Sequence, residues 1–179
     1  LAGHPVVLYL GKLSILEGSE LLKQIIQETC EALPDVRFLI IGSGPELESI
    51  QQFVRTRKLA DGVHVLGWID HSDVPDYINT ADVCLFPRAH TSFSEYTSPE
   101  NILKVSEYLA IGKPVIVPKM GGFKDASFPL IVVEPEEMAS ALIAYLKSPR
   151  SVESIGGPTW DVSHQRLGEV YRALGAIDD

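Results

Sequence analysis

Cysteine is scarce in this sequence, which limits the covalent and metal chemistry open to the chain. The two cysteines, Cys30 and Cys84, form no close-spaced pair and no metal-ligand pattern. Cys84 lies in the apolar stretch DVCLFP, which favours a buried, reduced thiol over a reactive one. We therefore predict no metal site and no other cofactor.

Long hydrophobic runs are also absent. No apolar stretch approaches the ~20 residues that a membrane span needs, so we expect no membrane segment in this chain. The opening LAGHPVVLYLGK leads directly into a strand, which argues against a signal peptide and predicts a cytoplasmic location. The same abrupt start leads us to expect that an N-terminal part is missing.

Positive charge is in deficit as well. The chain has 15 lysines and arginines against 24 aspartates and glutamates, a net charge of -9 and a pI near 5.0. A nucleic-acid backbone is therefore not an expected partner. An anionic small molecule could bind only through a local cluster of cations.

What the sequence does contain is a regular alternation of strands and helices. Its 179 residues fit one domain, 1–179, or one half of a larger enzyme. The strands are apolar at consecutive positions, which is typical of a parallel sheet covered on both faces. We predict an α/β fold with a doubly wound, Rossmann-like sheet of about six strands. The expected strands are 6–11, 36–42, 63–69, 82–87, 114–118 and 130–133, and a closing helix is expected over about 160–174.

In such sheets ligands bind beyond the carboxyl ends of the strands, so the residues that follow each strand are the candidates. Lys12 follows the first strand and could reach a phosphate, although a plain surface lysine explains it as well. Gly67, Trp68 and Ile69 follow the third strand. The tryptophan could pack on a planar base, or it could be a residue at the edge of the core.

The stretch KVSEYLAIGKPVIV holds a second candidate pair. Lys104 and Glu107 are one turn apart on an expected helix, where a carboxylate could accept a ribose diol and a lysine could neutralise a diphosphate. A solvated ion pair between the two is the alternative. Gly121 and Gly122, in KMGGF after the fifth strand, could form an anion nest or only a flexible loop.

Four stretches, taken in order, resemble the C-terminal half of group 1 glycosyltransferases. They are LYLGKL…EGSELL, FLIIGSGPELESIQQF, VHVLGWIDHSDVPDYINTADVCLFP and KVSEYLAIGKPVIVPKMGG, and the resemblance covers about residues 6–147. TWDVSHQRLGEVYRAL is similar to the closing helix of that family. The resemblance implies one half of a GT-B enzyme, which has two Rossmann-like domains and mostly retains the anomeric configuration.

The resemblance also implies a donor site for a UDP-, GDP- or ADP-sugar and a missing N-terminal domain that holds the acceptor. Glu107 matches the glutamate that binds the ribose hydroxyls, and Lys12 matches a basic residue on the diphosphate. Trp68 and Ile69 match the segment against the base. The loop that approaches the sugar and phosphate corresponds to Gly121 and Gly122, and such enzymes generally need no metal.

Two positions depart from the family pattern. Glu17 stands where the family has a second basic residue, so a phosphate contact is lost and the donor could be repelled. Pro99 stands where the first glutamate of a catalytic pair is expected, which makes the neighbouring Glu100 the candidate catalytic residue. The variant pattern K-x-x-E-Y fits residues 104–108, and Lys104 would then supply the positive charge that Glu17 does not.

These features together predict the donor-binding domain of a glycosyltransferase that is retaining and transfers a sugar to a glycan or lipid-linked acceptor, in polysaccharide or glycolipid assembly. Alone, the domain is expected to bind the donor without turnover. Two alternatives remain: a nucleotide-sugar epimerase on the same fold, and a degenerate, non-catalytic GT-B subunit.

Overall fold

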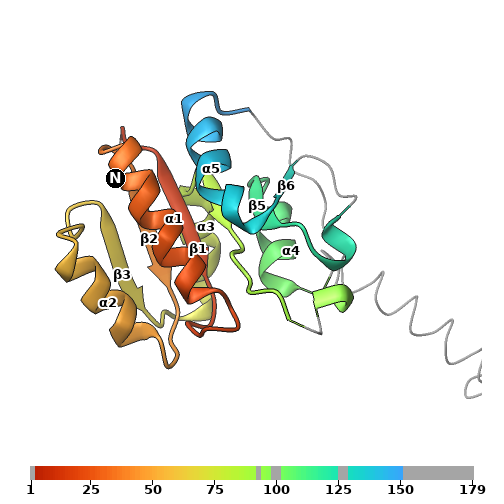
Figure 1. The fold of residues 1–179 in the computed structure, drawn as a ribbon, viewed down its shortest axis with the longest axis horizontal. Coiled ribbons are helices and arrows are strands. Elements are labelled where there is room, and N and C mark those ends of the chain that lie inside the picture. The colour runs from red at the N-terminus through yellow and green to blue at the C-terminus, as the bar shows by residue number, and fades with distance from the viewer. Residues whose placement is uncertain (1–2, 92–93, 98–101, 125–128, 151–179) are drawn as a thin grey trace, which may run out of the picture.

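The computed structural model describes residues 3–91, 94–97, 102–124 and 129–150. Its centre is one six-stranded sheet in the order β3-β2-β1-β4-β5-β6, with every pair of neighbours parallel (Figure 1). The expected α/β class and the six-stranded parallel sheet are therefore confirmed. The strands are β1 (Val6–Leu10), β2 (Arg37–Ile41), β3 (Val63–Gly67), β4 (Val83–Leu85), β5 (Val115–Pro118) and β6 (Leu130–Val133).

Helices cover both faces of the sheet, which explains why the strands are apolar at consecutive positions. Val7 and Tyr9 of β1 pack in one core cluster with apolar residues of three helices, α1 (Ser19–Ala32), α2 (Leu47–Thr56) and α5 (Met138–Lys147). Val6 and Leu8 face the opposite way. They pack in a second cluster with α3 (Val74–Thr80) and α4 (Leu103–Ala110).

The strand order fixes where a ligand site is expected. From β1 the chain steps outward to β2 and β3, and then returns to the other side of β1 to form β4. The order therefore reverses between β1 and β4. At such a point the connections leave the sheet edge in opposite directions and open a crevice at the carboxyl ends of the strands.

Short 3-10 turns connect several of these elements, at His71–Asp73, Ser94–Tyr96, Gly121–Phe123 and Pro135–Glu137. In the first of them Asp70 accepts a hydrogen bond from the Ser72 amide at 3.0 Å and caps the turn that leads into α3. The expected closing helix at 160–174 lies outside the described residues. None of the helices in the described ranges is long and apolar enough to cross a membrane.

Candidate functional site

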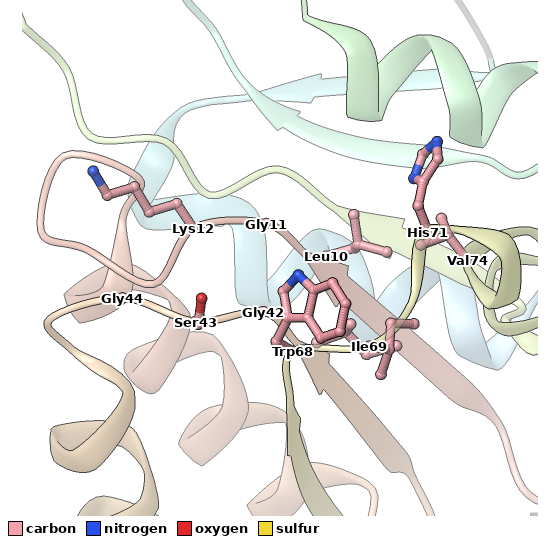
Figure 2. Close-up of a pocket in the computed structure, with 11 residues that line it drawn as sticks. Leu10, Gly11, Lys12, Gly42, Ser43, Gly44, Trp68, Ile69, His71 and Val74 are labelled. Atoms are coloured by element: carbon pink, nitrogen blue, oxygen red, sulfur yellow. The ribbon is translucent and has the colours of Figure 1, made fainter.

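A pocket of about 450 Å³ lies at the carboxyl ends of β1, β2 and β3 (Figure 2). The loops after these strands and the start of α3 form its walls, so the pocket borders the point where the strand order reverses. Its lining is mostly apolar or glycine, with a few polar groups at the rim, as small-molecule sites usually are. The lining residues are Leu10, Gly11, Lys12, Ile41, Gly42, Ser43, Gly44, Trp68, Ile69, His71 and Val74.

The floor of the pocket is built from backbone in close contact. The Gly11 amide donates to the Ile41 carbonyl at 2.9 Å, and the Gly42 amide donates to the Gly67 carbonyl at 2.7 Å. A Cβ on Gly42 would lie 1.8 Å from the Gly11 carbonyl oxygen, and one on Gly44 would lie 2.2 Å from the Leu13 carbonyl oxygen. Only glycine permits this close approach of the two loops.

Trp68 and Ile69 are neighbours in the chain, but one side chain is exposed and the other packs on the core. The Trp68 side chain is 72% exposed, so it is not a residue at the edge of the core, whereas Ile69 packs against the cluster beneath α3 and α4. An exposed indole beside a glycine floor offers a flat apolar surface to a ligand. Figure 2 shows Lys12 and His71 at opposite ends of the lining. The Lys12 side chain is exposed, and in the described ranges no ion pair is formed by its ammonium group.

Lys104 does not pair with Glu107. Its Nζ instead donates to Oε2 of Glu17 at 2.8 Å, while Arg88 Nη1 donates to Oε1 of the same carboxylate at 2.7 Å. The exposed fractions of the three side chains are 15% for Lys104, 18% for Glu17 and 24% for Arg88. Glu17 is therefore matched by two cations, and we call Glu17, Arg88 and Lys104 the charged triad. The alternative of a solvated Lys104–Glu107 ion pair is wrong.

Two aromatic side chains surround the triad. Lys104 Nζ lies 5.6 Å from the ring centre of Tyr9 and 5.4 Å from that of Phe86, within cation–π range. The Tyr9 hydroxyl donates to the Lys12 carbonyl at 2.8 Å. Burial, and next the nearby Glu17 carboxylate, raise the pKa of Tyr9 above its ordinary value. Tyr9 is therefore a neutral hydroxyl that holds the backbone of the loop after β1.

The other predicted residues are not among those that line this pocket. Glu107 is half-buried on α4 and does not line the cavity. The Gly122 amide donates to the Thr97 carbonyl at 2.7 Å, so it is engaged within the protein and not presented as one of two free amides. Gly121 has a positive φ of 46°. The candidate catalytic residue Glu100 lies outside the described residues, and the roles of all these residues stay predictions.

Some residues of the site were not singled out from the sequence. Gly11 and His71 line the pocket, and the rule that ligands meet the residues after each strand could have found Gly11. Ser43 lies in the stretch GSGPE after the second strand, which the same rule does select. The Tyr108 hydroxyl on α4 accepts from the Leu10 amide at 2.9 Å and so connects that helix to the end of β1. Burial raises the pKa of Tyr108 well above its ordinary value, which keeps the hydroxyl protonated. No pattern in the sequence indicates this contact.

The comparisons with known proteins agree with this geometry. A family model described as glycosyl transferases group 1 matches residues 4–148. The GPI3 subunit of phosphatidylinositol N-acetylglucosaminyltransferase from Saccharomyces cerevisiae is 33% identical over 90 residues, which are 50% of this chain and 19% of that protein.

Two solved structures share the fold. Sucrose-phosphate synthase from Thermosynechococcus elongatus superposes with a TM-score of 0.76 at 27% identity, over 98% of this chain and 47% of that one. Anabaena HepE in complex with UDP gives 0.71 at 18% identity, over 98% and 50%. The chain thus spans half or less of the length of the proteins that it matches.

Proposed function

Since the chain belongs to the group 1 glycosyltransferases and has the fold of a C-terminal GT-B domain, we propose that it binds a nucleoside-diphosphate sugar. The observation that carries the proposal is the pocket. It combines a backbone floor at Gly42, an exposed indole at Trp68 and an ammonium group at Lys12, all beside the reversal in strand order. A planar base can pack on the indole above the glycine floor, and a diphosphate needs a cation such as the Lys12 ammonium group.

In this proposal the base packs against Trp68 and Ile69 above the glycine floor. Glu107 accepts the ribose hydroxyls, because a carboxylate can accept two hydrogen bonds from a diol. The diphosphate meets Lys12 and, near the end of β1, Lys104 with Arg88. A solved neighbour in complex with UDP supports a nucleotide as the ligand, while the choice among UDP, GDP and ADP stays a prediction.

The reaction we propose is transfer of the sugar from its diphosphate to an acceptor hydroxyl. The bond between the anomeric carbon and the diphosphate oxygen breaks, and the acceptor oxygen forms the new bond to that carbon. The acceptor hydroxyl gives its proton to the departing diphosphate, which leaves as the nucleoside diphosphate. Negative charge grows on the departing diphosphate, and fixed cations close to it would lower the barrier. Lys12 lines the pocket, and Lys104, which shares Glu17 with Arg88, lies next to the lining residue Gly11.

The acceptor belongs to the part of the enzyme that this chain does not cover. We propose a retaining enzyme in a cytoplasmic compartment whose N-terminal domain binds a glycan or a lipid-linked acceptor. The yeast relative, named for transfer of N-acetylglucosamine to phosphatidylinositol, supports a lipid-linked acceptor. By itself the present chain should bind the donor and transfer nothing.

Thermal unfolding with added nucleotides tests the proposal. A ligand at 100 times its dissociation constant adds about 2.7 kcal/mol to the free energy of unfolding. We expect UDP, GDP or ADP to raise the melting temperature, and the matching nucleoside to raise it less. If none of the three nucleotides shifts the transition, the donor-binding proposal is wrong and the degenerate, non-catalytic subunit becomes the better reading.

A further inference from the structure

The charged triad lies where a sheet of this order binds its ligands. Glu17 follows β1, Arg88 follows β4, and Lys104 reaches them from α4, so the three side chains bridge the point at which the strand order reverses. A Cβ on Gly11 would lie 2.5 Å from Lys104 Nζ, and Gly11 lines the pocket. The ammonium group of Lys104 therefore lies next to a residue that lines the pocket.

The Glu17 carboxylate is bound as an anionic ligand would be. Each of its oxygens accepts one short hydrogen bond from a different cation, which is the arrangement that two phosphate oxygens also favour. Arg88 Nε is buried and, within the described ranges, has no hydrogen-bond partner. The two cations exceed the one carboxylate by a single positive charge. The two cations thus hold one carboxylate, while the Nε–H group of Arg88 remains an unused donor in the described part of the chain and one positive charge is not compensated within the triad.

We propose that Glu17 is an internal counter-ion of the donor site, which occupies Arg88 and Lys104 and so weakens the binding of a nucleoside diphosphate. This inference rests on the proposed function. It deepens that proposal by assigning Glu17, which holds two of the cations expected to meet the diphosphate, a role opposite to that of a phosphate ligand. Glu17 acts through the two cations and not by touching the donor.

Removing the charge of Glu17 has two opposing effects on the affinity for a nucleoside diphosphate. Their relative sizes decide whether the affinity rises or falls. A glutamine at this position raises the charge of the triad by one, which strengthens its attraction for a diphosphate over several ångströms. The same substitution also removes part of the contact that holds Arg88 and Lys104 in position. That loss is limited, because the glutamine oxygen still accepts from one cation and Lys104 remains within 5.6 Å of the Tyr9 and Phe86 ring centres. We therefore expect the gain in attraction to prevail.

Calorimetry on the full 179-residue chain with UDP and with uridine measures the effect. In Glu17→Gln we expect the dissociation constant of UDP to fall about fivefold, which corresponds to about 1 kcal/mol, and that of uridine to stay unchanged. Low ionic strength is needed, because salt screens charges over about 10 Å at 0.1 M. GDP with guanosine and ADP with adenosine are measured in parallel.

Glu20→Gln is the matched control. Glu20 lies one turn further along, pairs with Lys23 at 2.6 Å and is 67% exposed, so this variant removes the same charge and also breaks an ion pair. It should change neither dissociation constant. Where Glu17→Gln does not fold, Glu17→Asp keeps the charge but shortens the reach to both cations. It should tighten UDP binding by a smaller factor.

Three other results of these measurements would overturn the inference about Glu17. If Glu17→Gln weakens UDP binding, Glu17 positions the cations and the inference is wrong. An unchanged ratio of uridine to UDP dissociation constants, in a chain that binds both, also overturns it while leaving the proposed function intact. If the wild-type chain binds none of the six compounds, the proposed function fails and the inference fails with it.

Discussion

Gly42 provides a direct test of how the pocket floor is built. An added Cβ would lie 1.8 Å from the Gly11 carbonyl oxygen and 2.8 Å from the Gly11 carbonyl carbon, at a φ of 139° that L residues rarely adopt. Both atoms belong to the backbone, so no side-chain rotation can relieve the clash. Gly42→Ala must therefore push the loop after β1 away from the loop after β2.

The expected cost combines this overpacking with backbone strain, about 3 kcal/mol or more of unfolding free energy. For a chain of this size that corresponds to a fall of about 6–12 °C in melting temperature. Because the Gly11 and Gly42 loops also line the pocket, the variant should lose nucleotide affinity together with stability. Thermal unfolding by circular dichroism and calorimetry with UDP, GDP and ADP measure the two losses.

Gly67→Ala is the matched control for this prediction. Gly67 also has a positive φ, 75°, and is the last residue of the neighbouring strand β3, but a Cβ there would meet no atom within 4 Å. Only the conformational cost remains, about 1–2 kcal/mol, or a fall of about 2–8 °C. Equal destabilisation by the two alanines would refute the argument that backbone contact requires glycine at position 42.

Three further predictions concern single side chains. Trp68→Ala should change the unfolding free energy by less than about 0.5 kcal/mol, because the side chain is 72% exposed, yet weaken nucleotide binding about tenfold by calorimetry. An affinity that stays the same would remove Trp68 from the site. Glu107→Ala should weaken nucleotide binding at least tenfold, about 1.4 kcal/mol, and a 2′-deoxynucleotide should lose less; equal losses would contradict the ribose assignment. Burial raises the pKa of Cys30 from 9.0 to about 11, so the folded chain favours the protonated thiol. Its contribution to stability should be complete below pH 9 and decrease as pH rises through about 11, and Cys30→Ala should lessen that decrease in urea titrations from pH 7 to pH 11.

Much of the fold could be predicted because its signals are local. Consecutive apolar residues in VVLYL, RFLII and VIVP are enough to indicate strands buried on both faces. The short β4 was predicted too long, over 82–87 instead of Val83–Leu85. Its apolar run continues through Phe86, which is buried for a different reason, its contact with Phe123 at 5.6 Å between ring centres.

The candidate site could be predicted only in part. Lys12, Trp68 and Ile69 follow strands directly, so the rule on strand ends finds them and the structure places all three on one pocket. The ion-pair partner of Lys104 could not be predicted. Helical spacing indicates Glu107, three residues away, whereas the carboxylate that Lys104 contacts is Glu17, 87 positions earlier in the chain.

The sequence by itself determined the class of the fold and the set of residues at the sheet's carboxyl edge, because hydrophobic periodicity and chain direction are properties of short segments. It also determined the family, through the order of its motifs. Tertiary structure alone decided that Gly42 rests on Gly11, that Trp68 is exposed, and that Glu17 pairs with two cations. Each of these facts depends on how distant segments pack against one another. The energy of such packing depends on both segments, so the residues of one segment do not determine it.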